Sequence, residues 1–339
     1  MVCATMALCG VLAACLSVGG VLERVEAVDF AKIKSPVIFR GDDKFAFRDP
    51  AVVYHDGRFH LFFTLSENAA DGGYFNYLAQ SRSTDLVHWT WPRILTPRDR
   101  TKNFSSPGNV VRYRNEWILC LQTYPTPAKQ QFGTEASRLW IVRSKNLEDW
   151  SSPELLRVKG DDVPIERMGR MIDPFLLEDA DEPGKWWCFY KQNGVSKSYS
   201  YDLKRWTYVG RSPAGENVTI VRHGGEYVMF HSPANGIGVK RSRDLSRWGD
   251  DVAHLTLGQK DWSWARRRLT AATVIDLTGE PRVGTFVMFF HGDSDEGAAR
   301  QPAHGNASLA FAWSDDLVDW TWPGKTLSTT KPAMDRARQ

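Results

Sequence analysis

The sequence predicts an all-β protein that folds as a single five-bladed β-propeller domain. Two observations lead to this prediction. The motif Ser-x-Asp/Asn-Leu-x-x-Trp occurs five times, and each copy is preceded by apolar runs that are typical of β-strands. Four fixed positions that recur five times indicate an internal structural repeat. The five copies are residues 83–89, 144–150, 200–206, 242–248 and 314–320.

The residues before each copy have the pattern of a β-hairpin. In the first unit, runs 51–54 and 58–64 are separated by an Asp-Gly turn, and in the fourth unit runs 219–221 and 226–231 are separated by a Gly-Gly turn. β-branched and aromatic runs split by such turns are hairpin signals. A third short run precedes each motif and a fourth follows its Trp. Each unit is therefore predicted to be a four-stranded antiparallel sheet.

A single sheet of this kind cannot cover both of its faces, but five sheets arranged radially can pack on one another. We expect the motif to form the turn between the third and fourth strands. Its Asp or Asn would then bond to the amides of the turn, and its Trp would fill the space between blades. The propeller is expected to span residues 28–330, followed by a tail over 331–339.

The N-terminal residues 1–27 are predicted to be an export signal, because they are rich in small apolar side chains and carry no charge before Glu23. Residues 12–15 resemble the bacterial lipobox, which implies lipidation of Cys15, whereas cleavage after Ala27 would release a soluble protein. No Lys or Arg precedes the apolar stretch, unlike usual export signals. The expected location is periplasmic, outer-membrane or extracellular, with a lipid anchor at Cys15 as the only membrane contact.

The composition excludes several classes of function. The chain has 339 residues, 42% of them hydrophobic, and a formal net charge of +3. This mixed charge does not have the basic character of a nucleic-acid-binding protein, so no nucleic acid partner is expected. There is no phosphate-binding Gly-rich loop with Lys, no Gly-x-Ser-x-Gly and no His-Glu-x-x-His. Cys120 and Cys188 lie in apolar runs and are expected to be buried free thiols, with a disulfide between them as the alternative.

Three acids are expected to meet at one mouth of the channel. The first strand of each blade lines the channel of a propeller, and these strands begin near Asp49, Asp173 and Glu216 in the first, third and fourth units. Neighbouring carboxylates repel one another, so one of them should hold its proton at neutral pH. This arrangement suits glycoside hydrolysis, in which one carboxyl protonates the leaving oxygen and another activates water or attacks carbon. Asp-Pro is also an ordinary strand-entry dipeptide, so the prediction depends on its recurrence at equivalent positions.

The sequence resembles glycoside hydrolase family 43 and its five-bladed relatives. The resemblance covers roughly residues 37–323 and is carried by segments 47–54, 172–179 with 185–190, and 216–221. It implies that Asp49 is the general base, that Asp173 tunes and orients the acid, and that Glu216 is the general acid. The implied reaction is a single displacement with inversion. The family's usual Glu-Gly-Pro is replaced by Glu216-Asn217-Val218, which leaves the local turn open.

The resemblance also implies the substrate, which would be a plant or algal oligosaccharide or polysaccharide. An α-L-arabinofuranoside or a β-D-xyloside is the first expectation, and an anhydro-galactoside of an algal polysaccharide is the alternative. A propeller that binds carbohydrate without cleaving it, and a glycoside phosphorylase, also remain open. The β-fructosidase branch is disfavoured because its Trp-Met-Asn-Asp-Pro-Asn opening is absent, and sialidase chemistry because the repeat differs from the sialidase Asp-box in its Gly and its spacing.

Other side chains are candidates for contact with the substrate or a metal. His291 ends the predicted second strand of the fifth unit and could reach the axis, where members of the resembled family often hold calcium or water. A structural histidine is the alternative reading, since a single His makes no metal site. No cofactor is expected to be required. The candidate substrate-binding residues are Phe45, Arg48, Trp91, Arg170 and His231.

Overall fold

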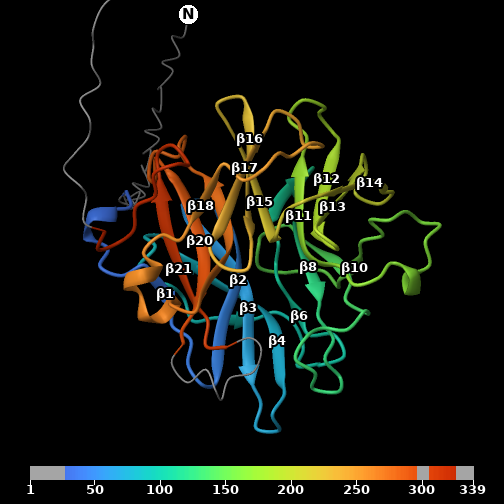
Figure 1. Ribbon diagram of the computed structural model, residues 1–339, viewed down its shortest axis with the longest axis horizontal. Helices are drawn as coiled ribbons and strands as arrows, with labels where there is room; N and C mark the ends of the chain where they lie inside the picture. Colours follow the sequence, from blue (N-terminus) through green and yellow to red (C-terminus); the bar gives the residue numbers. More distant parts are fainter. Residues whose placement is uncertain (1–26, 296–304, 326–339) are drawn as a thin grey trace, which may run out of the picture.

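The computed structural model describes residues 27–295 and 305–325. Within these residues the chain forms five β-sheets around a common centre, and its only helices are short 3-10 segments (Figure 1). The predicted five-bladed propeller is therefore confirmed. None of the described helices is long and apolar enough to cross a membrane. Cys15, nearly all of the predicted export signal and the predicted tail lie outside the described residues. The 3-10 segments are η1 (Phe30–Lys32), η2 (Ile165–Arg167), η3 (Gln259–Asp261) and η4 (Ser263–Ala265).

Three blades consist of four strands that are consecutive in the sequence. Blade one is formed by β2 (Phe45–His55), β3 (Arg58–Asn68), β4 (Tyr74–Ser83) and β5 (Arg93–Ile94). Blade three is formed by β11 (Ile172–Glu178), β12 (Trp186–Lys191), β13 (Val195–Ser200) and β14 (Thr207–Ser212). Blade four is formed by β15 (Glu216–His223), β16 (Glu226–Ser232), β17 (Ile237–Ser242) and β18 (Ala253–Leu255).

Blade two has an interrupted first strand, because two short strands pair in succession with the second one. Blade five takes its outermost strand from the beginning of the described chain. Blade two is formed by β6 (Phe104–Ser105), β7 (Val110–Tyr113), β8 (Glu116–Thr123), β9 (Leu139–Ser144) and β10 (Glu154–Leu155). Blade five is formed by β19 (Arg268–Asp276), β20 (Phe286–Asp293), β21 (Ser308–Ser314) and β1 (Val37–Phe39).

The prediction that a fourth strand follows the motif Trp in every unit is wrong for blade five. After Trp320 the described chain makes a single bridge, between Thr321 and Trp313. Instead β1 pairs antiparallel with β21, with Val37 opposite Ala310. An early segment thus completes the last sheet, and the ring is closed by hydrogen bonds between strands from the two ends of the propeller.

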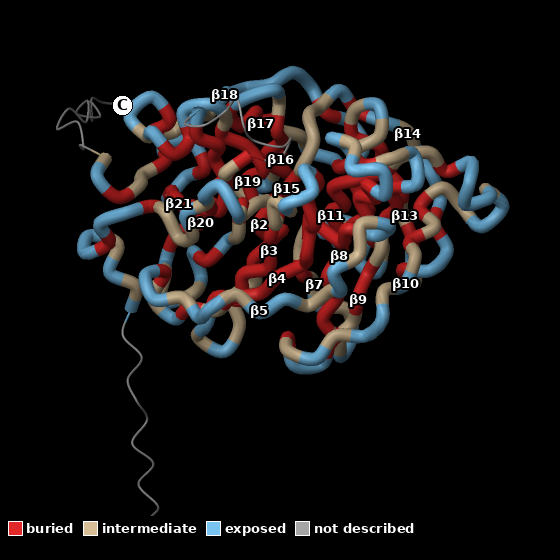
Figure 2. Tube along the Cα trace, turned by 90° about the horizontal axis from the view of Figure 1, so that it is seen from below, coloured by how far each residue is buried: buried red, intermediate tan, exposed pale blue. Residues whose placement is uncertain are grey.

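The core consists of five apolar layers, each between two neighbouring blades. Because successive side chains of a strand point to opposite faces, a central strand serves two layers at once. In β3, Leu61 and Phe63 pack toward blade five, whereas Phe62 packs toward blade two. Buried segments lie in the interior of the ring and exposed ones mainly along its outer loops (Figure 2).

The repeated motif has the structural role that the sequence predicted. In blade one, the Asp85 carboxylate accepts hydrogen bonds from the amides of Val87 and His88 at 2.9 and 2.7 Å. The Trp of the motif contacts the preceding blade: Trp150 lies edge-on to Phe62, with 5.4 Å between the ring centroids. The motif therefore turns the chain between the third and fourth strands and seals its blade against the preceding one. Cys120 and Cys188 are both buried free thiols, which confirms the first of the two readings.

Candidate active site

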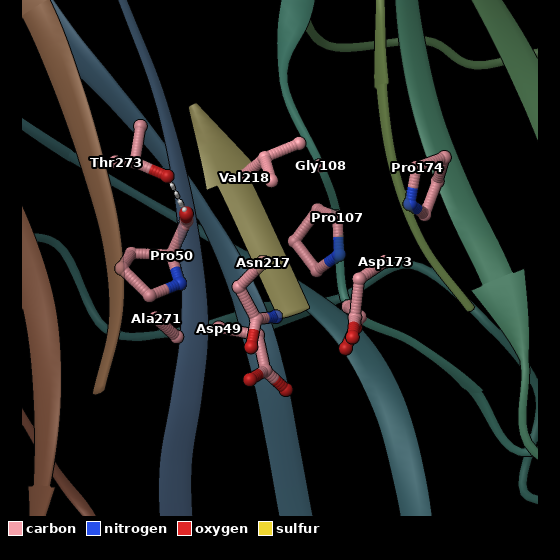
Figure 3. A pocket seen from close by; sticks show the side chains of 11 residues that line it. Asp49, Pro50, Pro107, Gly108, Asp173, Pro174, Asn217, Val218, Ala271 and Thr273 are labelled. Atoms are coloured by element: carbon pink, nitrogen blue, oxygen red, sulfur yellow. Dashed lines mark hydrogen bonds between the residues drawn. The ribbon is translucent and has the colours of Figure 1, made fainter. Parts of the chain in front are cut away.

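Each blade places one residue in the left-handed region within or directly beside its first strand. The pairing with the second strand slips at this point in blades one, three, four and five. Such a φ is uncommon for residues other than glycine, although Asp and Asn tolerate it best. Together the five residues line a narrow channel, and the carboxylates of two of them point toward the same end of it (Figure 3). They are Asp49 (φ 47°), Ser106 (40°), Asp173 (52°), Asn217 (50°) and Ala271 (55°).

Glu216 lies one position before the left-handed residue of blade four. Asn217, with a φ of 50°, adopts the turn for which a glycine would otherwise be favoured. The replacement of Gly by Asn in this segment therefore leaves the left-handed turn in place. Asp49 and Asp173 occupy the left-handed position itself, so Glu216 reaches the site from the neighbouring position of its strand.

The three acids line one cavity of about 540 Å³. Asp173 is only 6% exposed. Its burial, reinforced by the negative charges of Glu216 and Asp49, raises its pKa to about 8, although a hydrogen bond from Ser106 and the charge of Arg170 oppose the shift. At neutral pH this group of acids therefore holds one proton.

Three arginines line the same cavity: Arg48, Arg170 and Arg268. Arg268 begins β19 and its Nη2 lies 3.0 Å from Oε1 of Glu216. Burial alone would lower the pKa of Arg48, but the charges of Asp49 and other acids more than offset it, so the pKa is raised. The sequence pointed to Arg48 and Arg170, but to Arg268 only as part of the arginine run 266–268, which could favour an acidic glycan or be an ordinary solvated charge run. The more specific signal was its place at the start of an innermost strand.

The cavity also has an aromatic rim that sequence reasoning missed. Phe132 is 60% exposed and Tyr124 lies beside it in the lining. Arg170 anchors this rim, because its Nε donates to the carbonyl of Gly133 and its Nη2 to the Tyr124 hydroxyl, both at 3.2 Å. An apolar ring face held in this way can stack on a sugar ring. Phe132 belongs to a long loop between β8 and β9, where no periodic pattern could reveal its position.

Three predicted contact residues do not line the cavity. Phe45 packs against the apolar layer between blades five and one, and Trp91 is 91% exposed. His231 lies behind the site, where its Nδ1 accepts the amide of Gly215 at 2.9 Å. Its Nε2 then donates to Asp251, also at 2.9 Å. Burial lowers the pKa of His231, which favours the neutral ring that this amide requires. His231 thus supports the chain just before Glu216.

His291 lines the cavity, but the ring nitrogens that it could offer as ligands do not suit a calcium ion. Calcium prefers about six to eight oxygen ligands. The Nδ1 of His291 accepts the backbone amide of Asp49 at 3.1 Å, so this nitrogen is already engaged. Across residues 27–295 and 305–325, no group of three or more His, Cys, Asp or Glu side chains is arranged to hold a metal. The position of His291 instead fits the alternative reading as a structural histidine.

One protein-family sequence model matches this chain. The sequence model of the glycosyl hydrolases family 32 N-terminal domain matches residues 47–222, more than half of the chain. The chain belongs to this family. The matched region contains Asp49, Asp173 and Glu216. The sequence analysis pointed to family 43 and its five-bladed relatives. The assignment to the propeller glycoside hydrolases is confirmed, and the family whose model matches is family 32. No curated protein matches the sequence.

Solved structures that resemble this family 32 protein include several glycoside hydrolases. The α-L-arabinofuranosidase PaAbf62A from Podospora anserina is 14% identical, with a TM-score of 0.58, over 83% of this chain and 95% of the other. A thermostable family-43 glycoside hydrolase is 15% identical, with a TM-score of 0.58, over 89% and 98%. The family 43 endo-arabinanase from Bacillus licheniformis is 15% identical, with a TM-score of 0.55, over 86% and 100%. At these identities the likeness concerns the fold.

Proposed function

We propose that this family 32 glycoside hydrolase is an inverting enzyme that acts on plant or algal oligosaccharides or polysaccharides. The observation that carries the proposal is the meeting of Asp49, Asp173 and Glu216 in one cavity, with a proton held among them. An α-L-arabinofuranoside or a β-D-xyloside is the first substrate to test. Its support is the resemblance to arabinofuranosidases and arabinanases of the same fold.

In this mechanism Asp49 takes a proton from a water molecule as the water oxygen attacks the anomeric carbon. Glu216 gives its proton to the glycosidic oxygen as the bond from that oxygen to the anomeric carbon breaks. The products are a sugar of inverted configuration and a free hydroxyl on the leaving group. The proton that Glu216 gives is the one that the group of acids holds at neutral pH, and Asp173, which lines the same cavity, orients the acid.

Two measurements test this function. A panel of nitrophenyl glycosides and oligosaccharides, including arabinosides, xylosides and algal oligosaccharides that end in anhydro-galactose, is incubated with the enzyme with and without inorganic phosphate. We expect hydrolysis without phosphate on at least one sugar. Proton NMR of the first-formed product should show the inverted anomer. Retention would contradict the mechanism, turnover that depends on phosphate would indicate a phosphorylase, and binding without any product would indicate a carbohydrate-binding propeller.

A further inference from the structure

A side chain of the preceding blade holds the left-handed residue in four of the five blades. In each case an oxygen or a ring nitrogen on the second strand of one blade accepts the backbone amide of the left-handed residue of the next blade. The distances are 2.7 Å for Ser106 to Thr64 Oγ1, 2.6 Å for Asp173 to Gln122 Oε1, 2.8 Å for Ala271 to Ser232 Oγ and 3.1 Å for Asp49 to His291 Nδ1.

The four acceptors occupy one structural position. Within its own blade, each acceptor pairs across the sheet with the residue directly before that blade's left-handed residue. The pairs are Thr64 with Arg48, Gln122 with Ser105, Ser232 with Glu216 and His291 with Thr270. The corresponding residue of blade three is Lys191, opposite Ile172. A lysine ammonium can only donate, so it cannot hold the amide of blade four in this way. In blade four, His231 accepts the amide of Gly215 instead.

These hydrogen bonds stabilise a left-handed backbone conformation that is otherwise unfavourable in free energy. A residue other than glycine in the left-handed region is strained, and a buried amide without an acceptor adds a further penalty. All four acceptors are buried, with 3% exposure or less. For Asp49 and Asp173, the left-handed turn also decides in which direction the carboxylate leaves the strand. The acceptor therefore fixes the backbone turn and, through that turn, the direction of the Asp side chain.

We propose that Gln122 and His291 are positioning residues, which hold the left-handed turns of Asp173 and Asp49 and so set the spacing of the site's carboxylates. The proposal rests on the proposed function. Ser232 provides a matched comparison, because it makes the same bond to Ala271, whose methyl group has no chemical role. His291 can act in this way only as the tautomer that carries its proton on Nε2, since a protonated Nδ1 cannot accept a hydrogen bond.

The test compares Gln122→Met, which keeps the length of the side chain but removes the acceptor, with Ser232→Ala. We expect kcat to fall at least about 10-fold in Gln122→Met, with KM within about twofold, whereas Ser232→Ala keeps its kcat. Both variants should lose a similar amount of thermal stability. For His291, the acceptor is removed in His291→Leu and restored in His291→Asn, so we expect activity to be lost in the first and largely kept in the second.

A second readout does not depend on turnover. Carbon NMR of the labelled, substrate-free protein follows the titration of Asp173, which burial and the two neighbouring acids place near pH 8. In Gln122→Met this pKa should fall by at least about one unit, because the carboxyl is no longer held against the other acids, and it should stay unchanged in Ser232→Ala. If neither kcat nor this titration changes in Gln122→Met, or if Ser232→Ala changes both equally, the positioning role is refuted. A wild type without hydrolysis but with the NMR difference would refute the proposed function alone.

Discussion

Arg268 of blade five donates a hydrogen bond to Glu216 of blade four, with 3.0 Å between Nη2 and Oε1. The bond crosses the boundary between two blades and joins the proposed acid to an arginine that begins the next innermost strand. Because the guanidinium engages Oε1, the proton that Glu216 gives to the substrate oxygen would be carried on Oε2.

The first prediction concerns this pair. Arg268→Ala should lower kcat/KM by about 10- to 100-fold, which is the range expected for loss of a hydrogen bond between charged groups. Steady-state kinetics on the best substrate of the panel measure the effect. Arg266→Ala is the control, because Arg266 belongs to the same run of arginines but is exposed and does not line the cavity. Equal losses in both variants would mean that the pair has no special role.

The second prediction concerns the base and the acid. Asp49→Asn and Glu216→Gln should each lower kcat by about 10²- to 10⁴-fold, because each removes a proton-transfer group while keeping the shape of the side chain. Circular dichroism should show an unchanged fold. Asp85→Asn makes the same chemical change in a repeat turn, where blade two already has Asn146. It should keep full activity. Undiminished hydrolysis in the Asp49 and Glu216 variants would remove both assignments.

The third prediction concerns the stability of the site as a function of pH. The pKa of Asp173 is raised from 3.8 in the unfolded chain to about 8 in the folded protein. The folded state therefore binds this proton more tightly, and its stability falls as the pH rises from about 4 to about 8. Asp173→Asn carries no charge at any pH, so its melting temperature relative to the wild type should rise between pH 5 and pH 8, by at least about 2 °C. Thermal melts at several pH values measure this difference. A constant or falling difference would contradict the burial of an acid at this position.

The fourth prediction concerns the aromatic rim. Phe132→Ala should raise KM by about 3- to 10-fold with little change in kcat, because a ring that stacks on a sugar away from the reacting bond stabilises the ground state and the transition state alike. Kinetics with oligosaccharides of increasing length measure the effect. Tyr208, an exposed aromatic on the outer strand β14, is the matched control. A fall in kcat at unchanged KM would place Phe132 in another role.

The sequence predicted the fold well because the repeat has local physical causes. The Ser and the Asp or Asn of the motif bond to amides of their own turn, so the pattern is recognisable within seven residues. The closure of blade five was missed for the opposite reason. β1 has only three residues, and its partner β21 lies near the other end of the described chain. No short sequence pattern therefore predicts their pairing.

The site was predicted only in part. Asp49 and Asp173 are marked by a following Pro at equivalent positions, which makes them visible in the sequence. Arg268 and Phe132 reach the cavity through contacts between blades and through a long loop, neither of which leaves a periodic signal. The residue type alone also does not predict whether a tryptophan is packed or exposed. Trp91 and Trp322 both end a Trp-Thr-Trp sequence, but Trp322 packs against Trp262 at 5.6 Å whereas Trp91 is exposed.

The pairing of β1 with β21 has a consequence for biosynthesis. Since the two strands come from opposite ends of the ring, the last sheet cannot be completed until β21 has left the ribosome, after the other four blades. Until then β1 has no partner strand, and an unpaired strand is a template for pairing with other chains. Nascent molecules should therefore stay vulnerable to aggregation until β21 emerges, and a variant that lacks β1 should keep an open edge on β21 permanently.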